Sequence, residues 1–138
     1  MKLSGSETIL VAEDEELVRS LICRILKGMG CRVLEASGGP EALDMARAYE
    51  GKIDLLITDV VMPTMSGKEL VSRLTAIQPG IKILYISGYT ENAIVHHGIL
   101  DADVAFLQKP FTVEGLARKV VEVIYTRQNG EIGDAPPS

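Results

Sequence analysis

Short apolar segments alternate along the chain with longer segments of helical periodicity. Five runs rich in aliphatic and β-branched residues have the length of strands, and apolar residues then recur every three or four positions after each run. The expected strands are 8–12, 32–36, 55–58, 81–87 and 105–108, and the expected helices are 17–29, 40–48, 70–77, 91–100 and 113–124. Strands that are apolar on both faces and alternate with crossover helices are typical of a parallel sheet covered on both sides. The pattern therefore predicts an α/β fold with a doubly wound, five-stranded parallel sheet.

Several of the expected helices have recognisable ends. Gly30 is suited to end the first helix, Pro40 to open the second, and Thr112 to cap the last. Pro79 and Gly80 would stop the third. The first helix carries an apolar stripe at helical spacing, formed by Leu17, Val18, Leu21, Ile22, Ile25, Leu26 and Met29. A second stripe is expected on the last helix, formed by Val113, Leu116, Val120, Val123 and Ile124.

Composition narrows the class of protein. The 138 residues suit one domain, expected over 7–126 with a flexible tail or linker at 127–138, and the 14 Lys and Arg against 19 Asp and Glu give a net charge of -5. This balance argues against nucleic-acid binding.

No apolar run reaches the ~20 residues of a membrane span and no signal core opens the chain, so we expect a cytoplasmic domain without membrane contact. Cys23 and Cys31 are too few for a disulfide framework or zinc site, and we expect reduced, buried thiols.

Polar side chains gather at the ends of the expected strands. Glu13 and Asp14 follow the first strand, Asp59 follows the third, Ser87 ends the fourth and Lys109 follows the fifth. The carboxyl ends of parallel strands share one edge, and a strand order of 2-1-3-4-5 would bring the three carboxylates together. Such crowding favours a hard divalent cation, Mg²⁺ or alternatively Mn²⁺. A phosphoryl group could complete the site, with the lysine neutralising its charge and the serine donating a hydrogen bond, so the pattern indicates phosphoryl transfer to Asp59.

Four segments closely resemble the receiver domain of two-component response regulators, over about residues 7–126. They are ILVAEDE (9–15), DLLITDVVMPTMSG (54–67), ILYISGYT (83–90) and VAFLQKPF (104–111). The resemblance implies a flavodoxin-like fold and a phosphoacceptor that takes its phosphoryl group from the phosphohistidine of a histidine kinase or phosphotransfer domain. The implied roles are phosphoacceptor for Asp59, direct Mg²⁺ ligand for Asp14, ligand through water for Glu13, backbone carbonyl ligand for Val61, switch hydroxyl for Ser87, phosphate-binding lysine for Lys109 and a cis peptide bond before Pro110.

The resemblance also implies how the signal leaves the site. Ser87 would move toward the phosphoryl group and Phe106 would turn inward, changing the face formed by the fourth helix, the fifth strand and the fifth helix, where a downstream protein would bind. The chain has Glu13, Ser87 and Phe106 where the family more often has Asp, Thr and Tyr. Val61 and Tyr89 flank the expected path of water, so we expect slow self-dephosphorylation and no dedicated enzymatic role.

Other functions fit the residues less well. A phosphohydrolase of the haloacid dehalogenase type needs a second carboxylate at the position of Val61, and the acidic first loop is unsuited to the phosphate of FMN. A pseudo-receiver, which binds partners without phosphorylation, would not need the complete set of acids, hydroxyl and lysine. The segments ISGYTE and FLQKPF look most like receivers at the end of hybrid sensor histidine kinases, and a stand-alone regulator is the alternative.

Overall fold

Strands and helices alternate throughout the computed structural model, which describes residues 3–101 and 103–125. In chain order the elements are β1 (Thr8–Ala12), α1 (Glu16–Gly28), β2 (Arg32–Ala36), α2 (Gly39–Ala48), β3 (Leu55–Asp59), α3 (Gly67–Ile77), β4 (Lys82–Ser87), α4 (Glu91–His96), β5 (Phe106–Gln108) and α5 (Val113–Ile124). All strand pairs are parallel and the order is β2-β1-β3-β4-β5. The predicted fold class and strand order are confirmed.

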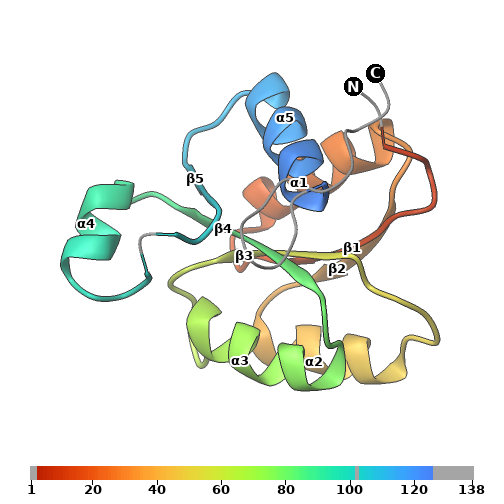
Figure 1. Cartoon of the computed structure of the whole chain (residues 1–138), viewed down its shortest axis with the longest axis horizontal. Coiled ribbons are helices and arrows are strands. Elements are labelled where there is room, and N and C mark those ends of the chain that lie inside the picture. Colours follow the sequence, from red (N-terminus) through yellow and green to blue (C-terminus); the bar gives the residue numbers. More distant parts are fainter. Residues whose placement is uncertain (1–2, 102, 126–138) are drawn as a thin grey trace.

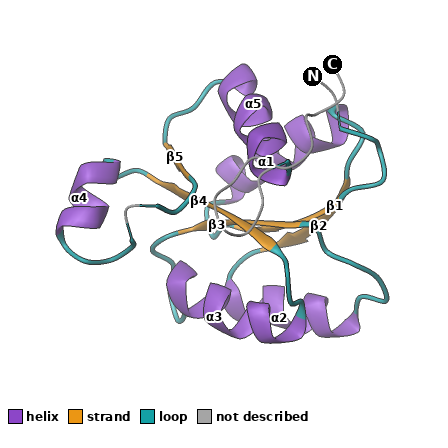
Figure 2. Cartoon of the chain, in the orientation of Figure 1, coloured by secondary structure: helices purple, strands orange, loops and turns teal. Residues whose placement is uncertain are grey.

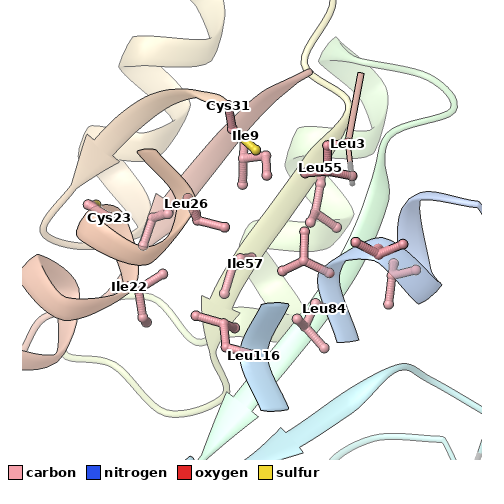
Figure 3. Packing of buried hydrophobic residues seen from close by; sticks show 14 of the residues in the cluster. Leu3, Ile9, Ile22, Cys23, Leu26, Cys31, Leu55, Ile57, Leu84 and Leu116 are labelled. Atoms are coloured by element: carbon pink, nitrogen blue, oxygen red, sulfur yellow. The ribbon is translucent and has the colours of Figure 1, made fainter. Parts of the chain in front are cut away.

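Helices cover both faces of the sheet. Figure 1 shows α1 and α5 on one side and α2 and α3 on the other, while α4 lies beyond the β4–β5 edge. The alternation of strand side chains divides the core in the same way: Ile9 faces α1 and α5, and its neighbour Leu10 joins the cluster under α2 and α3. Figure 3 shows the first cluster, in which Ile22 and Leu26 of α1 pack toward strand residues such as Ile57. Burial of each such side chain stabilises the fold by roughly 1.5–3 kcal/mol.

The helix ends follow from the residues that occupy them. Gly30, with φ of 90°, lies two residues past the end of α1, and its backbone N–H donates to the Lys27 carbonyl, while that of Cys31 donates to the Leu26 carbonyl. This pair of bonds is a Schellman motif, which needs the left-handed conformation that glycine adopts without strain. The hydroxyl of Thr112 caps α5 by accepting from the backbone of Gly115, as its sequence position predicts. Figure 2 shows how these helices connect to the strands through short loops.

The structure corrects the expected end of the fourth helix and shows which members of the two apolar stripes are exposed. The fourth helix ends at His96 rather than at residue 100, because Gly98 takes φ of 71° and closes a second Schellman motif. Leu17 and Leu21 belong to the apolar stripe of α1 but are 87% and 41% exposed, since the sheet covers only the inner side of that helix. Val113, in the first turn of α5, is likewise exposed.

Two further expectations concern the thiols and the chain end. Cys23 and Cys31 are free and buried, which confirms the expectation of reduced, buried thiols. The expected tail or linker at 127–138 lies outside the described residues. Within the part of the chain that the structure describes, no helix is long and apolar enough to cross a bilayer.

Candidate functional site: an acidic pocket at the carboxyl edge of the sheet

The acidic residues meet where β1 and β3 end side by side. Ala12 pairs in register with Thr58, so Glu13 and Asp59 come next to each other at the carboxyl edge. Both are buried, and Asp14 beside them is exposed. One carboxylate oxygen from each of the three residues lies within 4.8 Å of the others. The structure thus brings together the three carboxylates that the sequence pattern singled out.

Lys109 reaches into this cluster from the segment that follows β5. Its ammonium lies 2.7 Å from Oε1 of Glu13 and 2.8 Å from Oδ2 of Asp59. Its backbone N–H donates to the Ser87 carbonyl at 2.7 Å, which fixes the lysine beside the end of β4. The peptide bond between Lys109 and Pro110 is cis, as the resemblance implied. Residues from three separate strand ends therefore form one ion-paired site.

Burial and charge act in opposite directions on the groups of this site. Burial raises the pKa of Glu13, although hydrogen bonds from the Glu15 backbone and from Lys109 favour its ionised form. Burial alone would lower the pKa of Lys109, but the hydrogen bonds and negative charges of Asp59 and Glu13 outweigh it and the pKa is raised. The ammonium therefore stays charged at neutral pH.

The carboxylates have the composition of a magnesium site. The cluster of three acidic side chains has one half-buried ammonium beside it, which leaves an excess of negative charge. Apart from its ion pair with Lys109, the buried Oε1 atom of Glu13 accepts no hydrogen bond from the described residues. Hard oxygen donors with uncompensated charge fit Mg²⁺, and Mn²⁺ takes the same donors. The residues present therefore fit the cation that the sequence predicts.

The expected switch residues lie next to the pocket but not inside the acidic cluster. Ser87 is buried at the end of β4, and its hydroxyl accepts a hydrogen bond from the Tyr89 backbone at 3.0 Å. Phe106 pairs in register with Tyr85 and is half-buried in a small cluster that includes Ile94 of α4. No hydrogen bond joins the Ser87 hydroxyl to Asp59 in the residues that the structure describes.

Three residues near the site were not identified from the sequence as functional. A side chain at Gly67 would place its Cβ 2.2 Å from the Asp59 carbonyl oxygen, so only glycine allows α3 to begin this close to β3. The Arg19 guanidinium donates to the Glu13 carbonyl at 2.8 Å. The Glu15 carboxylate lies 3.4 Å from the Lys109 ammonium. In the sequence, Arg19 is distinguished only as a polar residue within the apolar stripe of α1, and Glu15 only as a glutamate at the start of that helix.

An apolar hollow of about 340 Å³ lies beside the lysine. It is lined by Val18 and Leu21 of α1 and by Lys109, Pro110 and Phe111 of the segment that follows β5. Together with the exposed Leu17, these side chains place an apolar surface directly next to the charged site.

Comparison with known proteins agrees with this geometry. The family model for the response regulator receiver domain matches residues 9–121, and the chain belongs to this family. Sensor kinase CckA of Brucella abortus is 42% identical over 122 residues, which are 88% of this chain and 13% of the kinase. The response regulator receiver protein CpdR of the same organism is 34% identical over 84% of this chain and 95% of its own length.

Solved structures show the same fold. The receiver domain of the hybrid histidine kinase CckA superposes with a TM-score of 0.72 at 38% identity, covering 85% of this chain and 98% of that domain. The chemotaxis protein CheY4 of Vibrio cholerae gives 0.73 at 28% identity, covering 86% of this chain and 98% of the other. The chain thus spans a small part of one curated relative and nearly all of another. As a family, receiver domains interact with histidine kinases or phosphotransfer proteins.

Proposed function

We propose that this chain is the phosphoacceptor of a two-component phosphorelay and that Asp59 carries the phosphoryl group. The observation that supports this most strongly is the placement of the Lys109 ammonium between buried Glu13 and Asp59, with Asp14 beside them. Phosphoryl transfer needs a positioned nucleophile and neutralised oxygens more than it needs covalent help from the protein. This arrangement supplies both.

The two oxygens of Asp59 are suited to different roles. The Lys109 ammonium forms an ion pair with Oδ2, while Oδ1 accepts a long hydrogen bond, at 3.4 Å, from the Val61 backbone N–H. In the proposed step Oδ1 bonds to phosphorus as the bond from phosphorus to the histidine nitrogen breaks, and the electron pair leaves with that nitrogen. Lys109 then neutralises the transferred oxygens, and the Ser87 hydroxyl donates to one of them.

A bound Mg²⁺ would supply further neutralisation of the same oxygens. In our proposal Asp14 and Asp59 hold it directly, Glu13 holds it through water, and the Val61 carbonyl completes the protein ligands. The side chains of Val61 and Tyr89 are 57% and 63% exposed beside the pocket, where they would hinder water. We therefore expect slow self-dephosphorylation, and an aspartyl phosphate that decays within seconds would contradict this.

The partner that donates the phosphoryl group would be a histidine kinase or a phosphotransfer domain. The apolar hollow beside Lys109 and the exposed Leu17 offer apolar contact area next to Asp59, which a protein donor needs and a small donor does not. The downstream protein would bind the face of α4, β5 and α5, once Ser87 has moved and Phe106 has turned inward. The half-buried position of Phe106 next to α4 is consistent with such a switch.

Two contexts fit the domain. Its likeness to the CckA receiver favours the terminal receiver of a hybrid histidine kinase, while the coverage of CpdR along nearly its whole length fits a stand-alone regulator. We propose the first and keep the second as the alternative. Transfer from a kinase domain encoded in the same gene would support the first.

Intact mass after incubation with Mg²⁺ and acetyl phosphate tests the phosphoacceptor role. We expect the chain to gain one phosphoryl group that hydroxylamine removes, and Asp59→Asn to gain none. The control is a receiver known to label under the same conditions. A folded wild-type chain that stays unlabelled when the control labels would favour a pseudo-receiver.

A further inference from the structure

Glu15 contacts the site without belonging to the magnesium cluster. Its carboxylate lies 3.4 Å from the Lys109 ammonium, which also binds Glu13 and Asp59 at shorter distances. The side chain of Glu15 is 63% exposed, whereas those of Glu13 and Asp59 are 0% and 10% exposed. Glu15 is therefore a solvent-exposed charge that borders the acidic pocket through its contact with Lys109.

The local structure gives Glu15 no other evident task. It occupies the N-cap position of α1, yet its side chain caps none of the free N–H groups of that helix. Ser66, Thr90 and Thr112 occupy the same position before α3, α4 and α5, and each accepts a hydrogen bond there. Glutamate is a poor capping residue compared with Ser, Thr, Asp and Asn. Its carboxylate instead turns toward Lys109.

The charges of the site show what the additional carboxylate does. Glu13, Asp14 and Asp59 carry three negative charges, which one Mg²⁺ and the Lys109 ammonium would balance. Glu15 then adds an unbalanced negative charge at the mouth of the pocket. Because like charges repel and the focused potential of a pocket controls the approach of ions, this charge opposes the entry of an anionic donor.

We propose that Glu15 is a specificity-determining residue that slows phosphorylation of Asp59 by small dianionic phosphodonors. This inference rests on the proposed phosphoacceptor function. With acetyl phosphate, Oδ1 of Asp59 bonds to phosphorus while the bond to the acetate oxygen breaks, and acetate leaves with the electron pair. A small donor has only its charge and phosphoryl group to bind with, so repulsion at the entrance acts fully on it. A protein donor gains compensating contact with the apolar surface around Lys109.

The test compares Glu15→Gln with Glu16→Gln. Glu16 is also exposed, lies in the first turn of α1 and loses the same charge, but no ion pair joins it to Lys109 in the described residues. Labelling rates are measured by intact mass at saturating Mg²⁺ with acetyl phosphate and with phosphoramidate, which carries less negative charge at neutral pH. Isothermal titration with Mg²⁺ alone provides a second measurement that does not depend on phosphorylation.

We expect Glu15→Gln to label about three- to five-fold faster than wild type with acetyl phosphate at low ionic strength. The gain in labelling rate over wild type should be smaller with phosphoramidate. The difference should nearly vanish at ~1 M salt, where the Debye length is about 3 Å. Glu16→Gln should differ from wild type by less than about two-fold, and Mg²⁺ should bind Glu15→Gln about two-fold more weakly than wild type.

Equal rates for wild type and Glu15→Gln, or equal gains in both variants, would overturn the inference while leaving the phosphoacceptor function in place. An unchanged Mg²⁺ affinity in Glu15→Gln would also count against it, because the carboxylate would then not contribute to the potential of the site. Failure of folded wild type and both variants to label would instead overturn the proposed function, and with it this role of Glu15.

Discussion

Lys109 supplies the ammonium that pairs with the buried carboxylates of the acidic pocket. Its ammonium contacts two buried carboxylates at 2.7 and 2.8 Å and is itself only 14% exposed. A buried charge that loses its partner destabilises a protein strongly, because the desolvation cost stays while the attraction is lost. The pocket should therefore depend on either the lysine or a divalent cation.

Removal of this ammonium makes the dependence measurable. We expect Lys109→Gln to lower the free energy of unfolding in EDTA by about 1–3 kcal/mol, and Mg²⁺ to restore more stability to the variant than to wild type. Urea unfolding followed by far-ultraviolet circular dichroism measures both effects. The matched control is Lys119→Gln, which loses a surface ion pair with Glu122 and should change stability by less than about 0.5 kcal/mol. Equal losses in the two variants would contradict this account.

Gly67 sets the distance between α3 and the phosphoacceptor. A Cβ at this position would lie 2.2 Å from the Asp59 carbonyl oxygen and 3.2 Å from Cα of Val60, and backbone atoms cannot give way cheaply. We expect Gly67→Ala to lower the free energy of unfolding by about 2 kcal/mol or more. Gly28→Ala is the control, because its Cβ would meet nothing within 4 Å and alanine favours helix by roughly 0.5–1 kcal/mol. Thermal melting that ranks the two variants in the reverse order would disprove the steric argument.

Among the helices, α4 has the least support from the core. It has six residues, of which only Ile94 is buried, and its cluster is the smallest of the three. By comparison, α1 buries Ile22, Cys23 and Leu26. Few buried contacts mean a low free energy of local opening, which suits an element that changes its packing in signalling.

Hydrogen exchange tests this ranking of the helices. We expect amides of α4 to exchange faster than those of α1 and α5 in the unphosphorylated chain, because local opening of α4 exposes less apolar surface. After labelling with acetyl phosphate, exchange should change in α4 and β5 and stay nearly constant in α2. Uniform protection of α4 and α1, or changes confined to α2, would contradict a switch through the face of α4, β5 and α5.

The whole molecule has a predictable response to alkaline pH. Burial raises the pKa of the Cys23 and Cys31 thiols from 9.0 to about 11, and nearby carboxylates add to the effect. Because the unfolded chain then gives up these protons at lower pH than the folded chain, the thiols contribute stability that is fully present below pH 9 and is lost as the pH rises toward 11.

This loss should appear as a falling free energy of unfolding between about pH 9 and 11. The double variant Cys23→Ala and Cys31→Ala should start lower, because it loses buried volume, but show a shallower slope over this interval. Urea midpoints across the interval measure the slope. Identical slopes for wild type and variant would show that other groups control the alkaline limit.

Much of the fold and the acidic cluster was predictable because both depend on local pattern and simple topology. Parallel strands end at one edge, so Glu13, Asp14, Asp59 and Lys109 could be placed together without coordinates. The exposure of Leu17 and the early end of α4 could not, because periodicity does not say how far a neighbouring element extends over a helix. The contact of Glu15 with Lys109 could not be predicted either, because it depends on the directions of two side chains that are 94 residues apart in the chain.

The central claim is that Asp59, paired with Lys109 at the sheet edge, is the group that accepts the phosphoryl. Borohydride reduction of the labelled chain, followed by peptide mass spectrometry, locates the acyl phosphate directly because it converts a phosphorylated aspartate to homoserine. We predict homoserine at position 59 and an unmodified aspartate at position 14. Homoserine at another position, with Asp59 unchanged in the labelled protein, would contradict the account.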